Sequence, residues 1–360
     1  QLSQSMLGTV GRQPHLIEVL KRETDGNCFF IVEVVRALAE EAGRLVDIDR
    51  MTIPDYVVAG RIGEIVRRRL SHIPKWGQEL LKLSALAGRY LDKTVIQHIA
   101  QHQLTIQLGE HSVNDWLTIC ADYTILELQD LKWRFVHDKL REIIVQDLSQ
   151  DRRIQFHHKI AEAIETVYPA NSSYNEILLE HWHQAGQLDK EIQYLIHVAK
   201  HLIHTLADYG HARELLERGI KQLTQDDPRR ITLWNLQAQL ELLQGNYDEA
   251  QLLAHRITKL AEPSDGYQSI IKSSMTLGIV AVSQGKYEHA QSYFLQSLNI
   301  SRNIGSRENI AMCILNLANV ARNLGDYEQA LHQFQRCLTM FEELDKPQEI
   351  AWTFNGLGSV

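Results

Sequence analysis

The stretch "GDYEQA", residues 325–330, occurs in nearly the same form twice more, as "GNYDEA" at 245–250 and "GKYEHA" at 285–290. The three glycines are forty residues apart each time. A fixed period of this length is typical of a solenoid, in which each repeat is one supersecondary unit that packs only on its neighbours. We therefore expect a superhelix of stacked units in the C-terminal part of the chain.

Further positions recur with the same period and describe a helical hairpin. They are Tyr247, Tyr287, Tyr327, Ala250, Ala290, Ala330, Phe294, Phe334, Leu298 and Leu338. We expect the glycine to end a first helix in a left-handed cap, and the recurring positions to form a second helix. Small residues at 278, 290, 318 and 330 let the two helices approach closely. We expect the tyrosine and phenylalanine to fill the gap to the next hairpin.

This pattern resembles the tetratricopeptide repeat, in a form of forty residues with longer helices than usual. The resemblance implies a mainly α protein ending in a right-handed α-solenoid over residues 229–360. Its copies span 229–268, 269–308 and 309–348, with a partial copy at 349–360. In the first copy, Gln237 and Ala254 stand where a leucine and an aromatic residue are expected. Weaker hairpin patterns, one of them around Gly186, predict degenerate helical hairpins over 137–228.

The first half of the chain has a different pattern. Apolar spacing predicts helices at 62–70 and at 79–87, the second of them ended by Gly88. Asp92 is expected to cap a third helix, and Asn114 or Asp115 a fourth. The alternating apolar residues of "TILELQDLKWRFVH" at 124–137 predict a β-hairpin. Helices followed by a hairpin indicate a winged-helix-like module over residues 61–136.

Three stretches resemble, in this order, the distal part of the bacterial STAND-type signalling ATPases. They are "TDGNCFFIVEVVRALAEE" at 24–41, "IGEIVRRRLSHIPKWGQELLKLSALAG" at 62–88 and "WRFVHDKLREIIVQDLSQDRRIQFHHKIAEAIE" at 133–165. The resemblance implies that residues 1–60 end the helical lid of an AAA-type ATPase. It also implies a function: the repeats bind a partner or inducer and so control a nucleotide switch encoded upstream in the same chain.

In that family the lid carries a Gly-x-Pro motif that contacts adenine. The matching residues are Gly26, Asn27 and Cys28, with cysteine in place of proline, and the resemblance implies that they lie beside a nucleotide bound by the parent protein. The chain contains no GxxxxGK[ST] motif, and the nearest string, "GRYLDKT" at 88–94, has Asp92 in place of the second glycine. Its carboxylate would repel phosphate. We therefore expect no cofactor or catalytic group in these residues, and ATP or ADP with magnesium in a longer parent protein whose phosphate-binding half precedes Gln1.

Composition narrows the remaining possibilities. The net charge of -8 excludes a general nucleic-acid coat, and the helix expected at 114–123 carries no lysine or arginine, so we do not expect DNA binding. Four scattered cysteines favour a reducing compartment, and no apolar run reaches the ~18 residues of a membrane span. We expect a cytoplasmic protein.

His98 and His102 share one helix face but lack a third ligand, so we expect no metal. For His137-Asp138 we expect helix capping by Asp138 rather than acid–base chemistry.

Tetratricopeptide arrays bind protein segments on the concave face lined by first helices. Five residues are expected to project there: Asn235, Lys272, Asn319, Arg322 and Asn355. They lack the lysine-rich set that clamps a carboxylate, and ordinary solvation is the simpler interpretation. An alternative to the ATPase region is a free-standing adaptor without nucleotide binding. A weaker one is the regulatory part of a cyclase, protein kinase or transcriptional regulator. A P-loop immediately upstream would favour the first, and a start codon near Gln1 the adaptor.

Overall fold

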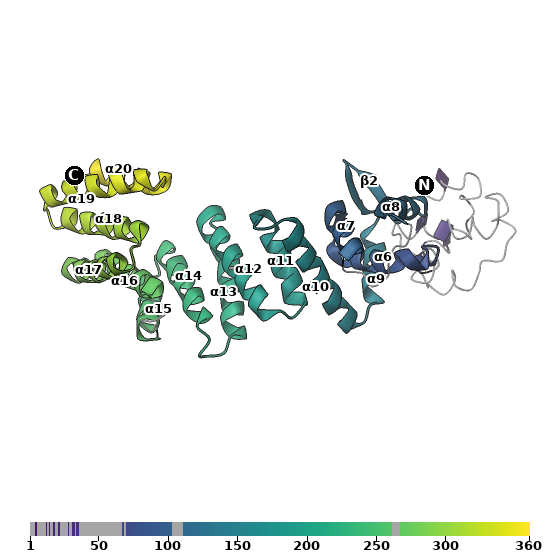
Figure 1. Ribbon diagram of the computed structural model, residues 1–360, viewed down its shortest axis with the longest axis horizontal. Helices are drawn as coiled ribbons and strands as arrows, with labels where there is room; N and C mark the ends of the chain where they lie inside the picture. The colour runs from purple at the N-terminus through teal and green to yellow at the C-terminus, as the bar shows by residue number, and fades with distance from the viewer. Residues whose placement is uncertain are drawn as a thin grey trace. The chain divides into compact units, whose positions relative to one another are not determined.

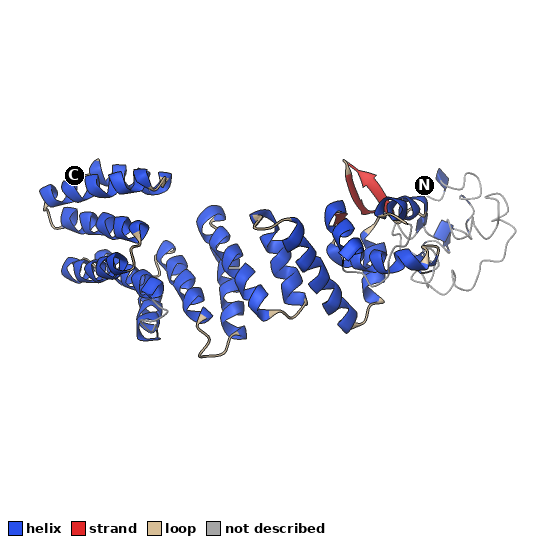
Figure 2. Ribbon diagram, in the orientation of Figure 1, coloured by secondary structure: helices blue, strands red, loops and turns tan. Residues whose placement is uncertain are grey.

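The structure is a computed structural model that describes residues 70–102, 111–260 and 267–360, together with isolated positions between residues 4 and 67. The described residues are mainly helical (Figure 2). They divide into two compact units, Gln1–Glu191 and Ile192–Val360. Gly26 and Asn27 lie outside the described residues. So does the helix predicted at 62–70, of which only Arg67 and Leu70 are described. Cys28 is described, as a helical and exposed residue.

The first unit combines helices with a small sheet (Figure 1). Its described elements are α6 (Lys75–Ala87), β1 (Tyr90–Leu91), α7 (Lys93–His102), α8 (Val113–Asp122), β2 (Leu126–Gln129), β3 (Lys132–Phe135), α9 (Asp138–Gln146), α10 (Gln150–Val167), the short 3₁₀ helix η3 (Ser172–Tyr174) and α11 (Asn175–Gln184). The predicted hairpin is confirmed, because β2 and β3 pair antiparallel with Leu126 opposite Phe135. Strand β1 was not predicted; it pairs with the other edge of β3, so the sheet order is β1-β3-β2.

The core of this unit is built around Trp116 of α8. The indole is fully buried, and its Nε1–H donates to the carbonyl of Gly77 on α6 at 3.0 Å. A Cβ on Gly77 would lie 2.7 Å from Trp116 Cδ1, which is closer than carbon atoms pack. Glycine at this position therefore allows α8 to lie close against α6. Phe135 of β3 is also fully buried and joins the sheet to the core.

Two predicted helix boundaries are confirmed. Helix α6 ends at Gly88, which has φ +133. Asp92 caps α7: its Oδ1 accepts hydrogen bonds from the backbone N–H groups of Thr94 at 2.9 Å and Val95 at 3.2 Å. These bonds satisfy two of the amide groups that the first turn of a helix leaves without partners.

Two other predicted caps are wrong by one or a few residues. The N-cap of α8 is Ser112, whose hydroxyl accepts from the Asp115 N–H while the Asp115 carboxylate accepts from the Ser112 N–H at 2.7 Å. Asp115 thus serves as the second member of a capping box. The N-cap of α9 is His137, whose Nδ1 accepts from the Lys139 N–H at 3.2 Å. Asp138 follows that cap and forms an ion pair instead.

The second unit is a succession of helical hairpins (Figure 1). Its elements are α13 (Tyr209–Gln222), α14 (Arg229–Leu243), α15 (Tyr247–Leu260), α16 (Tyr267–Ser283), α17 (Tyr287–Asn303), α18 (Arg307–Asn323), α19 (Tyr327–Glu343) and α20 (Pro347–Leu357). Helix α12 (Leu188–His201) crosses the boundary between the units and continues into a short π-helix, η4 (Leu202–Leu206). From α13 onward each helix packs on the next one along the chain.

The repeated glycines end first helices, as predicted. Gly245, Gly285 and Gly325 have φ values of 77°, 71° and 82°. At the second of these turns the Gly285 N–H donates to the Val282 carbonyl at 3.0 Å, and the next residue's N–H donates to the Ala281 carbonyl at 2.9 Å. This pair of bonds is a Schellman motif, which requires a left-handed residue and therefore favours glycine.

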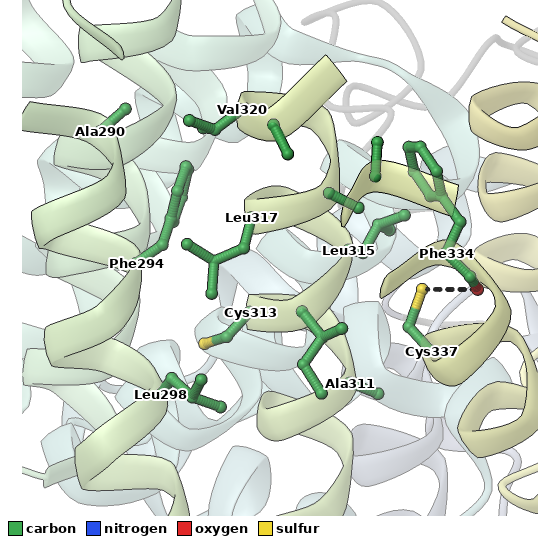
Figure 3. Packing of buried hydrophobic residues seen from close by; sticks show 14 of the residues in the cluster. Ala290, Phe294, Leu298, Ala311, Cys313, Leu315, Leu317, Val320, Phe334 and Cys337 are labelled. Carbon is green, nitrogen blue, oxygen red and sulfur yellow. Dashed lines mark hydrogen bonds between the residues drawn. The ribbon is translucent and has the colours of Figure 1, made fainter. Parts of the chain in front are cut away.

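The hairpins pack through the small and aromatic positions of the repeat (Figure 3). Ala290 and Ala330 are fully buried, and Phe294 and Phe334 are at most 1% exposed. A Cβ on Gly278 would lie 2.4 Å from Phe294 Cε1. The prediction that small residues allow close helix approach is therefore confirmed.

The prediction for the tyrosines is wrong in part. Tyr247 and Tyr327 are 39% and 56% exposed, and only Tyr287 packs against the cluster around Phe294. Each tyrosine is the first residue of its helix, where the neighbouring hairpin does not cover it. The phenylalanines, two turns further along, fill the gap alone.

Candidate partner-binding face

The first helices of the hairpins lie against one another. Helix α14 packs on α16, and α16 packs on α18. In the described part of the chain no comparably close pairing joins the second helices α15, α17 and α19. A second helix packs on the first helix of the next hairpin, but in the described hairpins only first helices pack on helices of their own kind. The first helices therefore form the inner row of the stack, and their uncovered side is the inner face.

Helix α16 leaves one stripe open on this inner row. Lys272 and Ile279 are exposed. Met275 and Val282 are half-buried, because they also pack against the core cluster that contains Phe294. The four positions follow the helical spacing of three and four residues. The other residues between Ile271 and Ala281 are all buried. The stripe is therefore apolar along most of its length and carries a cation at its N-terminal end.

Two of the residues predicted to line this face are freely exposed. Lys272 forms no ion pair within the described part of the chain, and the Asn355 side chain has no hydrogen-bond partner there. Asn319 and Arg322 are partly buried and already engaged. The Asn319 amide donates to the Leu315 carbonyl at 3.1 Å, and Arg322 Nη1 donates to Ser359 Oγ at 3.0 Å.

Asn235 does not project as expected. It is only 5% exposed, and its Nδ2 donates to the Ile231 carbonyl one turn earlier, at 3.0 Å. This position is more deeply buried in α14 than its equivalent Met275 is in α16. A short amide that bonds its own helix leaves little for a partner to contact.

Two further basic residues lie near Lys272. Lys200 and His204 stand one helical turn apart in α12 and η4, and both are exposed. Desolvation lowers the pKa of Lys272, and the charge of Lys200 lowers it further, while Glu308 opposes this effect. Desolvation also lowers the pKa of His204, and Lys200 and Lys272 add to that shift. The cationic cluster at the N-terminal end of the stripe therefore consists of Lys200 and Lys272, beside a histidine that is neutral at pH 7.

Sequence reasoning missed the apolar part of the stripe and this cationic cluster. The signal for Met275, Ile279 and Val282 was present, because they follow Lys272 at helical spacing. Only polar residues were selected as candidates, since apolar ones on a repeat helix are usually core. The approach of Lys200 to Lys272 joins residues of different hairpins, and no periodicity predicts it.

Asp92 and the histidines of α7, which the sequence offered as nucleotide-site and metal-site candidates, have other neighbours in the structure. In the "GRYLDKT" string, Asp92 caps α7 and its Oδ2 accepts from the hydroxyls of Tyr168 at 2.9 Å and Tyr174 at 3.0 Å. This carboxylate is structural, and residues 88–94 do not fit a phosphate-binding loop. The rings of His98 and His102 contact each other at a tilt of 46°, with centroids 4.7 Å apart. No group of three metal-ligating side chains occurs among the described residues.

The exposed face of α8, the helix directly before the β2–β3 hairpin, is acidic. Asn114, Asp115, Thr118 and Asp122 are exposed there, while Trp116 and its apolar neighbours are buried. DNA-binding helices present arginine or lysine to the phosphate backbone. This face offers neither.

Comparison with known protein families assigns the hairpins. Tetratricopeptide-repeat profiles match residues 229–303 and 310–344. The C-terminal hairpins are tetratricopeptide repeats. The repeat architecture inferred from the period of forty residues is thereby confirmed. No curated protein sequence matches the chain, and none of its described helices has the length and apolarity needed to cross a membrane.

Solved structures with similar folds are distant. One is a STAND protein with a tetratricopeptide repeat sensor from Pyrococcus horikoshii, with 13% identity over 90% of this chain and 55% of that chain, at a TM-score of 0.46. This chain thus spans little more than half the length of that protein. Others are a Rap protein complexed with competence and sporulation factor (15% identity, 79% of this chain and 78% of that one, TM-score 0.38) and NprR with its cognate peptide NprX (16%, 80% and 75%, 0.38).

Proposed function

We propose that these residues form the regulatory and protein-interaction region of a STAND-type signalling ATPase. In this proposal the tetratricopeptide stack binds a protein or peptide partner, or an inducer, on its inner face and thereby controls a nucleotide switch encoded upstream in a longer, cytoplasmic bacterial protein. The ATPase domain is then a second partner, in cis. The observation that carries the binding role is the stripe of α16, which is apolar along most of its length and ends at Lys272, a lysine with no ion pair in the described part of the chain.

The composition of the stripe suggests the chemistry of the partner. Met275, Ile279 and Val282 offer apolar contacts, and methionine adapts to irregular surfaces. Lys272, with Lys200 nearby, favours a negative charge at one end. A segment with an acidic group followed by apolar side chains fits this face best. Such a partner would lie along the inner row of first helices.

A photo-crosslinking experiment tests the binding role. A benzophenone amino acid is placed at Ile279 and, as the matched control, at Leu252, which is 64% exposed on the second helix α15. We expect a crosslinked product of one defined mass from position 279, none from position 252, and its loss in the Lys272→Glu variant. Equal products from both positions, or no effect of Lys272→Glu, would contradict binding on the inner face.

Residues 61–136 are proposed as a winged-helix-like module. The element order α6-β1-α7-α8-β2-β3, with sheet order β1-β3-β2, supports this interpretation. Because the exposed face of α8 is acidic, we propose that the module packs between the ATPase and the sensor rather than on DNA. Residues 1–60 are proposed as the end of the ATPase lid and 137–228 as degenerate hairpins.

Two parts of the proposal rest on the resemblance alone. Contact of Gly26, Asn27 and Cys28 with a nucleotide stays a prediction, as does the switch itself. The free-standing adaptor is the competing function. The mass of the native polypeptide in cell extract separates the two: a product of the size of these 360 residues favours the adaptor. A product larger by at least one domain of ~150 residues favours the ATPase, and nucleotide binding is then sought in the added part.

A further inference from the structure

A cavity of 570 Å³ lies in the first unit, bordered by α6, α9, α10 and α11. Its size is that of a small-molecule site. Its titratable lining consists of Arg141, Arg153, His157, Glu176, Glu180 and His181. None of these residues has a part in the proposed binding of partners by the repeats.

The cations of the cavity come from α9 and α10. Arg141 Nη1 donates weakly to the Ala85 carbonyl, at 3.4 Å, and its Nε is buried without a hydrogen-bond partner in the described structure. Arg153 donates from Nε to the Leu148 carbonyl at 3.2 Å. Both guanidinium groups are therefore held by backbone oxygens, and neither forms an ion pair with a described carboxylate.

The anions come from α11. Glu176 and Glu180 are one helical turn apart, so they share a face of that helix. Glu180 Oε1 accepts from Gln184 Nε2 at 2.9 Å, and Glu176 has no partner among the described residues. The cavity wall thus carries two half-buried guanidinium groups and two exposed carboxylates, and no ion pair among the described residues joins the two sets.

A neutral histidine pair completes the wall. His157 of α10 and His181 of α11 approach with Nδ1 atoms 2.8 Å apart and ring centroids 5.0 Å apart. Burial lowers the pKa of His181 to about 3, with a smaller effect of His157. Burial also lowers the pKa of His157, where Glu180 opposes the shift and Arg153 adds to it. At neutral pH one ring therefore donates its N–H to the other, and the pair adds no charge to the cavity.

We propose that this cavity binds a small zwitterion of the amino-acid or short-peptide class, with its carboxylate at Arg141 and Arg153 and its ammonium group at Glu176 and Glu180. The N–H groups of a guanidinium are suited to a carboxylate. A simple anion would meet the two glutamates without compensation, and a simple cation would meet the two arginines. A ligand that carries both charges satisfies all four groups.

Calorimetric titration of the 360-residue chain tests the proposal. The probes are the common L-amino acids and L-alanyl-L-alanine, with N-acetylated and C-amidated forms of each binder. We expect at least one unblocked probe to bind, and blocking either terminus to weaken binding by about tenfold or more. Binding by the dipeptide but not by free amino acids identifies peptides as the source, and the reverse result identifies free amino acids.

Two variants locate the site. Arg141→Gln and Glu180→Gln should each weaken binding by about tenfold or more. The matched control Glu162→Gln removes an exposed carboxylate of α10 that pairs with His158 and lies outside the cavity lining, and it should bind normally. If Arg141→Gln does not fold, Glu180→Gln and the blocked probes still decide the question. Absence of binding by every probe, equal binding of blocked and unblocked forms, or normal binding by both variants would overturn the proposal.

Discussion

The second unit repeats one hairpin, whereas the first unit surrounds a single core with elements that occur once. In the second unit Phe294 and Phe334 occupy equivalent positions and are equally buried. In the first unit Trp116 has no equivalent: its ring packs on α6 through Gly77, and one hydrogen bond fixes it there. We therefore expect a core substitution to destabilise only the neighbouring hairpins in the second unit, but most of the elements in the first unit.

The physical reason lies in the sequence separation of the contacts. In a repeat array each hairpin contacts only its neighbours, so stability is nearly a sum of hairpin and interface contributions. In the first unit β1 pairs with β3 across more than forty residues, from Tyr90 to Arg134. Elements closed by such distant contacts form or open together.

The largest expected effect comes from removing a buried aromatic ring in each unit, and the extent of the resulting loss of protection should differ between the units. Phe334→Ala should lower the stability of its hairpin interface by about 3–5 kcal/mol, because a fully buried phenyl ring leaves a cavity. Hydrogen exchange should accelerate in α18–α20 and stay slow in α6–α11. Trp116→Ala carries a similar cost, but should accelerate exchange throughout α6–α9. Uniform loss of protection over the whole chain in Phe334→Ala would contradict the local behaviour of the repeats.

Acid should also distinguish the units, through His181. Because its pKa is about 3 in the folded chain and near 6.5 in the unfolded one, the unfolded state binds more protons between these values. The contribution of the neutral His181 to the stability of the first unit is therefore fully present above pH 6.5 and is lost as the pH falls below it. His181→Gln should remove about 2 kcal/mol of this loss by about pH 4.5. Urea titrations at several pH values measure it, with His332→Gln, at an exposed position of α19 in the second unit, as the control.

A pair of glycines tests how tightly the repeats pack. Gly278→Ala should destabilise the second unit by about 1–3 kcal/mol, because the new Cβ meets the buried Phe294 ring at 2.4 Å. Gly210→Ala is the matched control: the nearest atom to its Cβ is 3.9 Å away, so it should be neutral or stabilise by up to about 1 kcal/mol. Thermal unfolding measures both. Equal effects at the two sites would mean that the α16–α17 hairpin widens without cost.

Sequence periodicity predicted the repeats well because three copies report on the same environment. A position that is small or apolar in each copy, such as Ala290 and Ala330, is buried in each. The exposed tyrosines escaped this reasoning, since recurrence shows that a position has a role but not that it is buried. The same reasoning predicted only part of the stripe of α16, because the residues at its positions differ between copies.

The first unit was predicted less accurately, for reasons of local geometry and distance. Asn114, Asp115 and Ser112 are all good capping residues, and only the backbone angles at the start of α8 decide between them. Two-residue strand β1 has no pattern of its own and exists because β3 offers an edge. The cavity between Arg141 and Glu180 arises from four helices that meet in space, which composition and spacing do not predict.

The smallest expected effect concerns the β-hairpin of the first unit, which strands β2 and β3 form. Asp130 and Leu131 join β2 to β3 with φ values of 49° and 63°, and Leu131 is 92% exposed. Both angles favour glycine or asparagine, as in a type I′ turn. Leu131→Gly should therefore stabilise the unit by about 0.5 kcal/mol. Leu128→Gly, at a 56% exposed position within β2, should instead destabilise it by about 0.5–1 kcal/mol. Thermal unfolding that moves in the same direction for both variants would refute the assignment of this turn.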